Sequence, residues 1–230
     1  MHKESLETYE FIADWIDPNF FYSKKDVWHR FGMLGVFGDY VLSCTSGAIG
    51  EIGVGESSIY LSALSKKYDR QIYFCDIAHG KIANPLTVPG YLREGGVLAF
   101  EKDGSVDLNH SHPSQALYYV GGSDQFFDNV ALPPMALSFI DGDHIYEQVK
   151  KDFWNFHKLT VENGYIILHD TYPPDEDHLR EERCGTVYKL RQELEKDDRF
   201  DVLTLPRGCA IGVGLTIVRV KPLKRYYFNE

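Results

Sequence analysis

The sequence predicts an α/β fold in a single domain spanning residues 1–230, and three features carry this prediction. From about residue 45 onward, short apolar runs alternate with amphipathic segments of helical period, as in a parallel sheet with crossover helices. The first of these runs leads into Gly53-Val54-Gly55, a turn that opens a helix. With 43% hydrophobic residues, the chain is also long enough to bury one large core.

The apolar and amphipathic segments predict the order of the elements. Strands are expected near residues 48–52, 72–75, 117–120, 136–140, 165–168, 200–205 and 211–220. Helices are expected over residues 57–67, 146–161 and 186–196. Residues 1–43 are expected to form a small N-terminal helical cap, in which a helix over residues 5–16 ends before Pro18.

An insertion is expected over residues 77–116, which are more than a tight βαβ connection requires. Within it, residues 97–101 and 106–110 flank Asp103-Gly104 and predict a β-hairpin. At the carboxyl edge of a parallel sheet such an insertion can line a substrate pocket. A surface elaboration without function is the alternative.

Composition narrows the partners and the compartment. A net charge of −10 makes nucleic acid and anionic membranes poor partners, and the only basic cluster is at residues 221–225. No apolar stretch approaches the roughly 20 residues that cross a bilayer. The four cysteines lack C-x-x-C spacing. We therefore expect a soluble cytoplasmic protein with a small-molecule partner, and the aromatic N-terminal cap is compatible with a homodimer.

The segment around the glycine turn predicts a nucleoside site. Gly53 and Gly55 permit a sharp turn and close approach of a ligand, and the helix that starts at Ser57 offers backbone amides. Glu51 lies inside the motif, where it would repel a pyrophosphate but could pair with the ammonium of an amino acid. The motif therefore favours S-adenosylmethionine over NAD as the cofactor.

Two later strand ends extend this site. Asp76 follows the glycines by roughly 20 residues, the spacing of a carboxylate that binds ribose hydroxyls. Ser123 and Asp124 lie in a turn after the third strand, where they could meet the adenine edge. A surface aspartate and a plain turn are the alternative interpretations.

The most informative segment is the end of the fourth strand, where Asp141, Asp143 and His144 follow an apolar run. His169-Asp170 follow the next strand, and neighbouring strands lie about 4.8 Å apart, so Asp141 and Asp170 can converge. Two such carboxylates repel each other unless a proton or a cation intervenes, and oxygen ligands suit Mg²⁺, with Mn²⁺ or Ca²⁺ as alternatives. Asp143 and His144 could instead serve only as a cap and a first-turn residue of the following helix.

The ends of the first three strands, with the glycine turn, Asp76 and Ser123-Asp124, resemble the pattern of class I S-adenosylmethionine-dependent methyltransferases. The segment Asp141-Gly142-Asp143-His144-x-Tyr146, followed by Asp152, Gly164 and His169-Asp170, is similar to the family among them that contains the macrolide-sugar O-methyltransferases, and more distantly to catechol O-methyltransferase. The resemblance covers about residues 45–172. It implies a Rossmann-like seven-stranded sheet in the order 3-2-1-4-5-7-6 with the last strand antiparallel.

The same resemblance implies roles for individual residues. Asp141 and Asp170 would be metal ligands, Asp141 would also border the cofactor, and His144 would be the general base, so that His144 and Asp141 are the expected catalytic residues. His169 stands where the family often has an acidic or amide ligand. As a ligand its imidazole would favour Mn²⁺, Fe²⁺ or Zn²⁺, and the alternative is a buried histidine with its hydrogen bonds satisfied.

These observations predict a divalent-metal-dependent O-methyltransferase of a small hydroxylated molecule, such as a sugar or another natural product. A metal-independent enzyme that methylates oxygen or nitrogen is the first alternative. A non-catalytic protein that binds S-adenosylmethionine as a partner in a complex is the second. An NAD-dependent oxidoreductase is the third, which Glu51 and the spacing of Gly53, Gly55 and Ser57 disfavour.

Overall fold

The structure is a computed structural model that describes residues 31–77, 96–100, 106–107, 116–206 and 213–221. Its strands are β1 (Ala48–Ile52), β2 (Ile72–Asp76), β3 (Gly96–Phe100), β4 (Val106–Asp107), β5 (Ala116–Val120), β6 (Met135–Ile140), β7 (Thr160–His169), β8 (Phe200–Leu205) and β9 (Leu215–Val220). Its helices are α3 (Gly32–Cys44), α4 (Ser57–Tyr68), α5 (Ser123–Asn129), α6 (Tyr146–Leu159), α7 (Val187–Leu194) and the short 3₁₀ helix η2 (Glu176–Leu179). The helix predicted over residues 5–16 lies outside the described residues.

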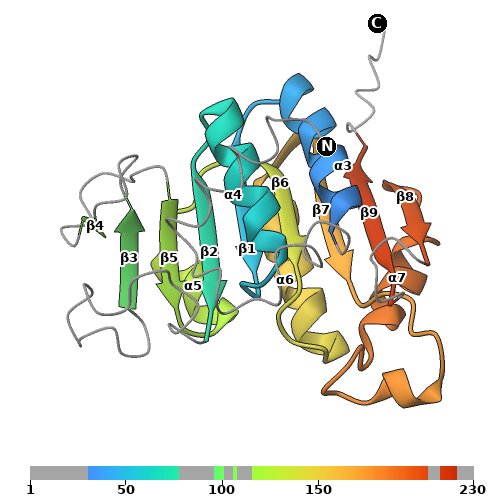
Figure 1. Cartoon of the computed structure of the whole chain (residues 1–230). Helices are drawn as coiled ribbons and strands as arrows, with labels where there is room; N and C mark the ends of the chain where they lie inside the picture. The colour runs from blue at the N-terminus through green and yellow to red at the C-terminus, as the bar shows by residue number, and fades with distance from the viewer. Residues whose placement is uncertain (1–30, 78–95, 101–105, 108–115, 207–212, 222–230) are drawn as a thin grey trace, which may run out of the picture.

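One sheet runs through the described part of the chain in the order β4-β3-β5-β2-β1-β6-β7-β9-β8 (Figure 1). Strands β5, β2, β1, β6 and β7 are parallel, and β9 is antiparallel to both β7 and β8. Without β3 and β4 this is the order 3-2-1-4-5-7-6 with an antiparallel last strand, so the predicted fold class is confirmed.

The predicted hairpin is present, since β3 pairs antiparallel with β4. Strand β3 also pairs antiparallel with β5, so the hairpin extends the sheet beyond seven strands. The described part of the insertion is therefore an edge of the sheet, and the rest, residues 78–95, 101–105 and 108–115, lies outside the described residues.

Helices cover both faces of the sheet in two layers (Figure 1). Buried side chains of α3 and α4 form one core with Ile49, Leu137 and Phe139. Buried side chains of α5, α6 and α7 form a second core with the opposite sides of the same strands, including Ile52 and Ile140. Alternate residues of a strand face opposite sides, which explains why β1 and β6 are buried at every position.

Helix α3 lies in the aromatic segment for which the sequence indicated no more than a helical cap. Its glycines allow close packing on α4, because a Cβ at Gly35 would lie 2.8 Å from the Tyr60 ring and one at Gly38 would lie 2.5 Å from Leu64. Glycine lowers helix propensity, so the local sequence alone does not predict this helix. Contact with α4 stabilises it instead.

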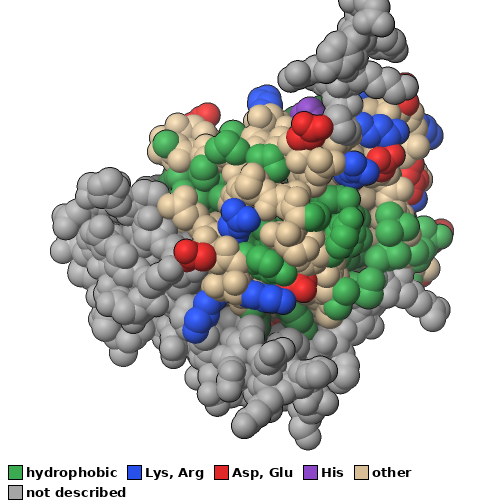
Figure 2. Space-filling view, turned by 90° about the horizontal axis from the view of Figure 1, so that it is seen from above, with side chains coloured by type: hydrophobic (Ala, Val, Ile, Leu, Met, Phe, Trp, Pro, Cys, Tyr) green, Lys and Arg blue, Asp and Glu red, His purple; other side chains and the backbone are tan. Residues whose placement is uncertain are grey.

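No helix among the described residues is both long and apolar enough to cross a bilayer. On the face seen in Figure 2, the described Lys and Arg side chains are interspersed with acidic, polar and apolar ones.

Candidate active site

The turn after β1 brings two strand ends into contact. Gly53 has a φ of 85°, and a Cβ there would lie 1.9 Å from the carbonyl oxygen of Asp141. The Gly53 amide donates to the Cys75 carbonyl at 2.9 Å, and the Asp141 amide donates to the Ile52 carbonyl at 2.8 Å. Only glycine fits this position, and the contact fixes the predicted catalytic edge against the glycine turn.

Glu51 and Ser57 lie beneath the turn. Glu51 is completely buried, and its Oε1 accepts a 2.6 Å hydrogen bond from the hydroxyl of Ser57 at the start of α4. This bond ties the strand before the turn to the helix after it. Contact of either side chain with a methionine group stays a prediction.

A cavity of about 500 Å³ opens at this edge of the sheet. Its lining includes five predicted cofactor residues, which are Gly53, Asp76, Ser123, Asp124 and Asp141. Glu51, Gly55 and Ser57 are not among the lining residues. The predicted site residues that follow β1, β2, β5 and β6 therefore share one cavity of a size suited to a nucleoside-containing cofactor.

The surrounding backbone fixes the positions of the residues that are predicted to bind the ribose and the adenine. Asp76 is largely buried, and its Oδ2 accepts a 2.8 Å hydrogen bond from the Val54 amide in the glycine turn. Ser123 and Asp124 are the first residues of α5, a helix where the sequence predicts a turn. This helix has only seven residues, too few for its period to be recognised.

Three side chains after β6 and β7 bring their donor atoms together. One ligand atom each from Asp141, His144 and Asp170 lies within 4.8 Å of the other two. Ile140 pairs with Leu168 across β6 and β7, so that the next residues, Asp141 and His169, lie opposite each other. Asp170 reaches the cluster one residue later through a left-handed backbone with a φ of 56°, a conformation that is strained for a residue with a side chain.

The hydrogen bonds of His144 define which ring nitrogen carries its proton. Nδ1 lies 2.9 Å from the Glu181 carbonyl oxygen, which can only accept, so Nδ1 is the protonated nitrogen. Nε2 then faces Oδ2 of Asp170 at 3.0 Å. Two lone pairs at this separation repel each other, so a proton or a cation belongs between them.

The charges in this cluster depend on one another. Burial disfavours a charged His144, but the hydrogen bond and the negative charge of Asp170 outweigh it and raise the pKa of His144. Burial likewise disfavours a charged Asp170, but the hydrogen bonds and charges of His144 and His169 hold the pKa of Asp170 well below its usual value. An ionised Asp170 is therefore the stable form at neutral pH.

His169 lies behind the two carboxylates. It is 5% exposed and packs against the rings of Phe31 and Phe139, at centroid distances of 5.2 and 6.3 Å. Its Nδ1 lies 2.9 Å from Oδ1 of Asp141 and 3.3 Å from Oδ2 of Asp170. The structure thus brings His169 to the predicted centre, although the three converging donor atoms are those of Asp141, His144 and Asp170. Its role as a ligand stays a prediction.

Residues 181–186 support His144 from a distant part of the chain. Gly185 has a φ of 52°, and a Cβ there would lie 2.3 Å from the His144 carbonyl oxygen. The Thr186 amide donates to the same carbonyl at 2.8 Å. Sequence reasoning missed Glu181 and Gly185, because no spacing relates a loop carbonyl to a histidine some 40 residues earlier.

A buried carboxyl lies on α6 behind the cavity. Asp152 is completely buried, and burial raises its pKa to about 6, an effect that Asp124 and Asp143 increase and hydrogen bonds from Ser123 and Gln148 oppose. The native carboxyl therefore binds its proton more tightly than the unfolded one, whose pKa is near 3.8.

Protonation of Asp152 gives a prediction for stability. The contribution of this group to the free energy of unfolding should be highest below about pH 4, decrease by about 3 kcal/mol as the pH rises to about 6, and stay level above. Asp152→Asn should remove this decrease, as urea unfolding between pH 4 and 7 would measure. Asp128→Asn, on the exposed face of α5, is the matched control. Parallel curves for wild type and Asp152→Asn would contradict the assignment.

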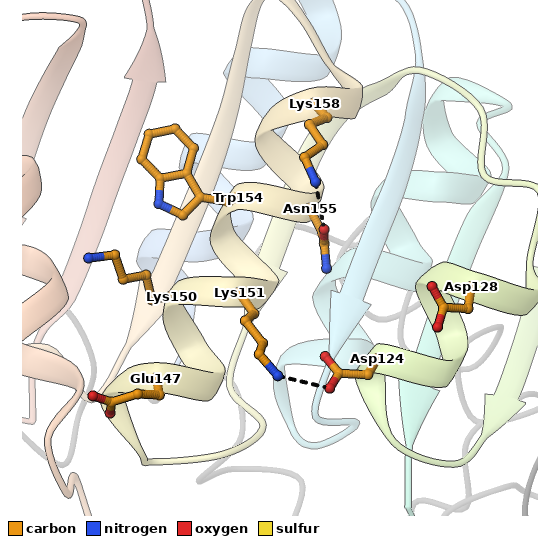
Figure 3. Close-up of a pocket in the computed structure, with 8 residues that line it drawn as sticks. All are labelled: Asp124, Asp128, Glu147, Lys150, Lys151, Trp154, Asn155 and Lys158. Carbon is orange, nitrogen blue, oxygen red and sulfur yellow. Dashed lines mark hydrogen bonds and ion pairs between the residues drawn. The ribbon is translucent and has the colours of Figure 1, made fainter.

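A second hollow lies on the outer surface between α5 and α6 (Figure 3). Its charged side chains are exposed, and Lys151 pairs with Asp124 at 3.1 Å. The hollow is separate from the acidic cluster, since none of its lining residues belongs to that cluster.

Comparison with known proteins agrees with this geometry. A family model described as a methyltransferase domain matches residues 51–171, a range that begins in the glycine motif and ends just after Asp170. The curated proteins include no match to the chain.

Solved structures share the fold. Cofactor-bound Rv0187 from MTB superposes with a TM-score of 0.60 at 13% identity, over 96% of this chain and 91% of that one. An O-methyltransferase from Bacillus cereus in complex with SAH gives 0.59 at 14% identity, over 96% and 92%. MycE, a methyltransferase of the mycinamycin biosynthetic pathway in complex with Mg, SAH and mycinamycin VI, gives 0.50 at 18%, over 83% of this chain and 49% of that one.

The family match covers more than half of the chain and contains both the glycine turn and the acidic cluster. The chain therefore belongs to the methyltransferase domain family and is an S-adenosylmethionine-dependent methyltransferase.

Proposed function

We propose that the chain is a divalent-metal-dependent O-methyltransferase that acts on a small hydroxylated molecule, such as a sugar or another natural product. The observation that carries this proposal is the convergence of Asp141, His144 and Asp170 within 4.8 Å at the edge of the cofactor cavity, of which Asp141 is a lining residue. A methyl donor in the cavity would thus lie beside groups that can bind a cation and accept a proton.

S-adenosylmethionine fits the cavity by its chemistry. Asp76 offers a carboxylate for ribose hydroxyls, and Ser123 and Asp124, which line the same cavity, offer polar groups for the adenine. Asp141, which follows β6, lines the cavity as well. The neighbours from Bacillus cereus and from the mycinamycin pathway contain SAH, which agrees with this assignment.

The acidic cluster fits a divalent cation. The carboxylates of Asp141 and Asp170 are oxygen ligands of the kind that Mg²⁺ or Mn²⁺ accepts, and the imidazole of His144 lies beside them, with its Nε2 3.0 Å from Asp170. MycE contains Mg, which supports the proposal at the level of the shared fold. Asp141 and Asp170 would hold the ion, with His144 beside it.

His144 is the proposed general base. Glu181 holds its Nδ1–H, which leaves Nε2 as the nitrogen that can take a proton. Loss of the O–H proton to Nε2 leaves the acceptor oxygen to form the new C–O bond while the S–CH₃ bond breaks, and SAH and the protonated histidine result. A bound divalent ion lowers the pKa of a hydroxyl and orients it. The remaining contribution of the chain is to hold the two reactants in line.

A metal-independent methyltransferase is the second candidate, and one observation favours it. The Nδ1 atom of His169 lies 2.9 Å from Asp141 and 3.3 Å from Asp170, where its proton can reduce the repulsion between the carboxylates. In that case His144 would act without an ion.

Chelation separates the two candidates. After dialysis against EDTA, transfer of labelled methyl groups from S-adenosylmethionine to a panel of phenols, catechols and sugars is expected to fall at least about 100-fold and to return with Mg²⁺ or Mn²⁺. Calorimetric binding of SAH to the same dialysed sample is the control for an intact fold. Full activity after chelation would contradict the metal and favour the second candidate.

A further inference from the structure

Gln148 on α6 contacts the polar side chains at the start of α5. We propose that Gln148 is a positioning residue that orients Ser123 and Asp124 to recognise the 6-amino group of the cofactor's adenine. This inference rests on the proposed adenine site and adds a determinant of its specificity.

The side-chain amide of Gln148 joins two helices. Its Nε2 lies 2.9 Å from Oγ of Ser123, 3.2 Å from Oδ1 of Asp124 and 3.1 Å from Oδ1 of Asp152. An amide nitrogen has two hydrogens, so the three acceptors share them. Gln148 also lines the cofactor cavity, which places this junction at the wall of the site.

Asp152 orients the side-chain amide of Gln148. It follows Gln148 by one helical turn, is completely buried and also has a hydrogen bond with the hydroxyl of Ser123. With its proton directed at Asp152, the Ser123 oxygen accepts from Gln148. The buried carboxyl therefore fixes both side chains, because a departure of either would leave it with one donor fewer.

Asp124 is oriented from α6 at both of its oxygens. Gln148 donates to Oδ1, and Lys151 pairs with Oδ2 at 3.1 Å, as Figure 3 shows for the lysine. The lysine pair is exposed at both partners, at 59% and 53%, so solvent screens it and it contributes little. The contact of Gln148 with Asp124 is exposed as well, but Gln148 is half-buried and is also held by its contacts with Ser123 and Asp152, so its position is the better defined of the two.

The chemistry of this arrangement favours a 6-aminopurine. A carboxylate accepts a hydrogen bond from an exocyclic amino group but repels the carbonyl oxygen of a 6-oxopurine. With Gln148 in place, the carboxylate of Asp124 is held in one orientation beside the cavity. Its preorganisation increases the discrimination between the two purines.

The test compares two ligands on one variant. For Gln148→Met, which keeps the unbranched shape, we expect calorimetry to show SAH binding weakened about tenfold. Binding of S-inosylhomocysteine, which carries a 6-oxopurine, should change less than about threefold. The ratio of the affinities for SAH and S-inosylhomocysteine should therefore be smaller in Gln148→Met than in the wild type. Lys158→Met, an exposed lysine on the same helix that does not line the cofactor cavity, is the matched control and should stay within about twofold for both ligands.

A second variant keeps the proposal testable if Gln148→Met unfolds, which a melting curve would reveal. Gln148→Glu has the same shape but exchanges the donor for an acceptor, and it should weaken SAH by more than tenfold. Unchanged SAH binding in a folded variant, or an equal loss for both ligands, overturns the role of Gln148 while leaving the proposed function in place. A wild type that fails to bind SAH overturns both.

Discussion

Replacing His144 with glutamine is expected to lower kcat for methyl transfer by about 10²- to 10⁴-fold, which corresponds to about 3–5 kcal/mol. The reason is that Nε2, which faces Asp170 at 3.0 Å, is the nitrogen left to accept a proton once Glu181 holds Nδ1–H. Affinity for SAH should stay within about threefold, because His144 does not line the cofactor cavity. Initial rates at saturating S-adenosylmethionine and calorimetry measure the two quantities.

A histidine elsewhere in the same region is the matched control. His178, on η2, has an Nδ1 hydrogen bond to Asp175 and no contact with the acidic cluster among the described residues. His178→Gln should leave kcat within about twofold. If His144→Gln retained wild-type kcat in the folded protein, a general-base role would be wrong.

Gly53→Ala is expected to weaken SAH binding by at least about 100-fold and to lower the free energy of unfolding by about 3–5 kcal/mol. The new Cβ would lie 1.9 Å from the Asp141 carbonyl oxygen, and the φ of 85° is unfavourable for alanine. Relief of the contact requires the ends of β1 and β6 to separate. Asp141 would then move away from Asp170, and catalysis would be lost with binding.

Gly55 provides a control within the same motif. Among the described residues, a Cβ at Gly55 would meet only Oγ of Ser57, at 4.0 Å, so Gly55→Ala should bind SAH within about threefold of the wild type and melt at a similar temperature. Equal effects of the two substitutions would show that the close approach of β1 and β6 does not control the site.

The central strands were predictable because each is a short, largely apolar run between polar turns. Strand β1 has the predicted bounds, and both of its faces are buried by helices. Strand β3 shows the limit of this reasoning. The short runs on either side of Asp103-Gly104 predict a hairpin, but no local pattern predicts that β3 also pairs with β5 and so joins the sheet.

The candidate site was predictable to the extent that it depends on strand order. Adjacent parallel strands that both end in acidic residues bring Asp141 and Asp170 together, as expected. The pairing of Ile140 with Leu168 adds what sequence could not supply, because this register places His169 opposite Asp141. The same holds for Glu181, whose carbonyl reaches His144 through a loop whose path no local pattern encodes.

The most direct test of this account is anomalous diffraction from a crystal of the protein grown with SAH and Mn²⁺. The account predicts one Mn²⁺ peak within coordination distance of carboxylate oxygens of both Asp141 and Asp170, with the sulfur of SAH facing it across the cavity. A crystal with SAH bound but no Mn²⁺ between these residues, or with SAH away from the Gly53 turn, would contradict it.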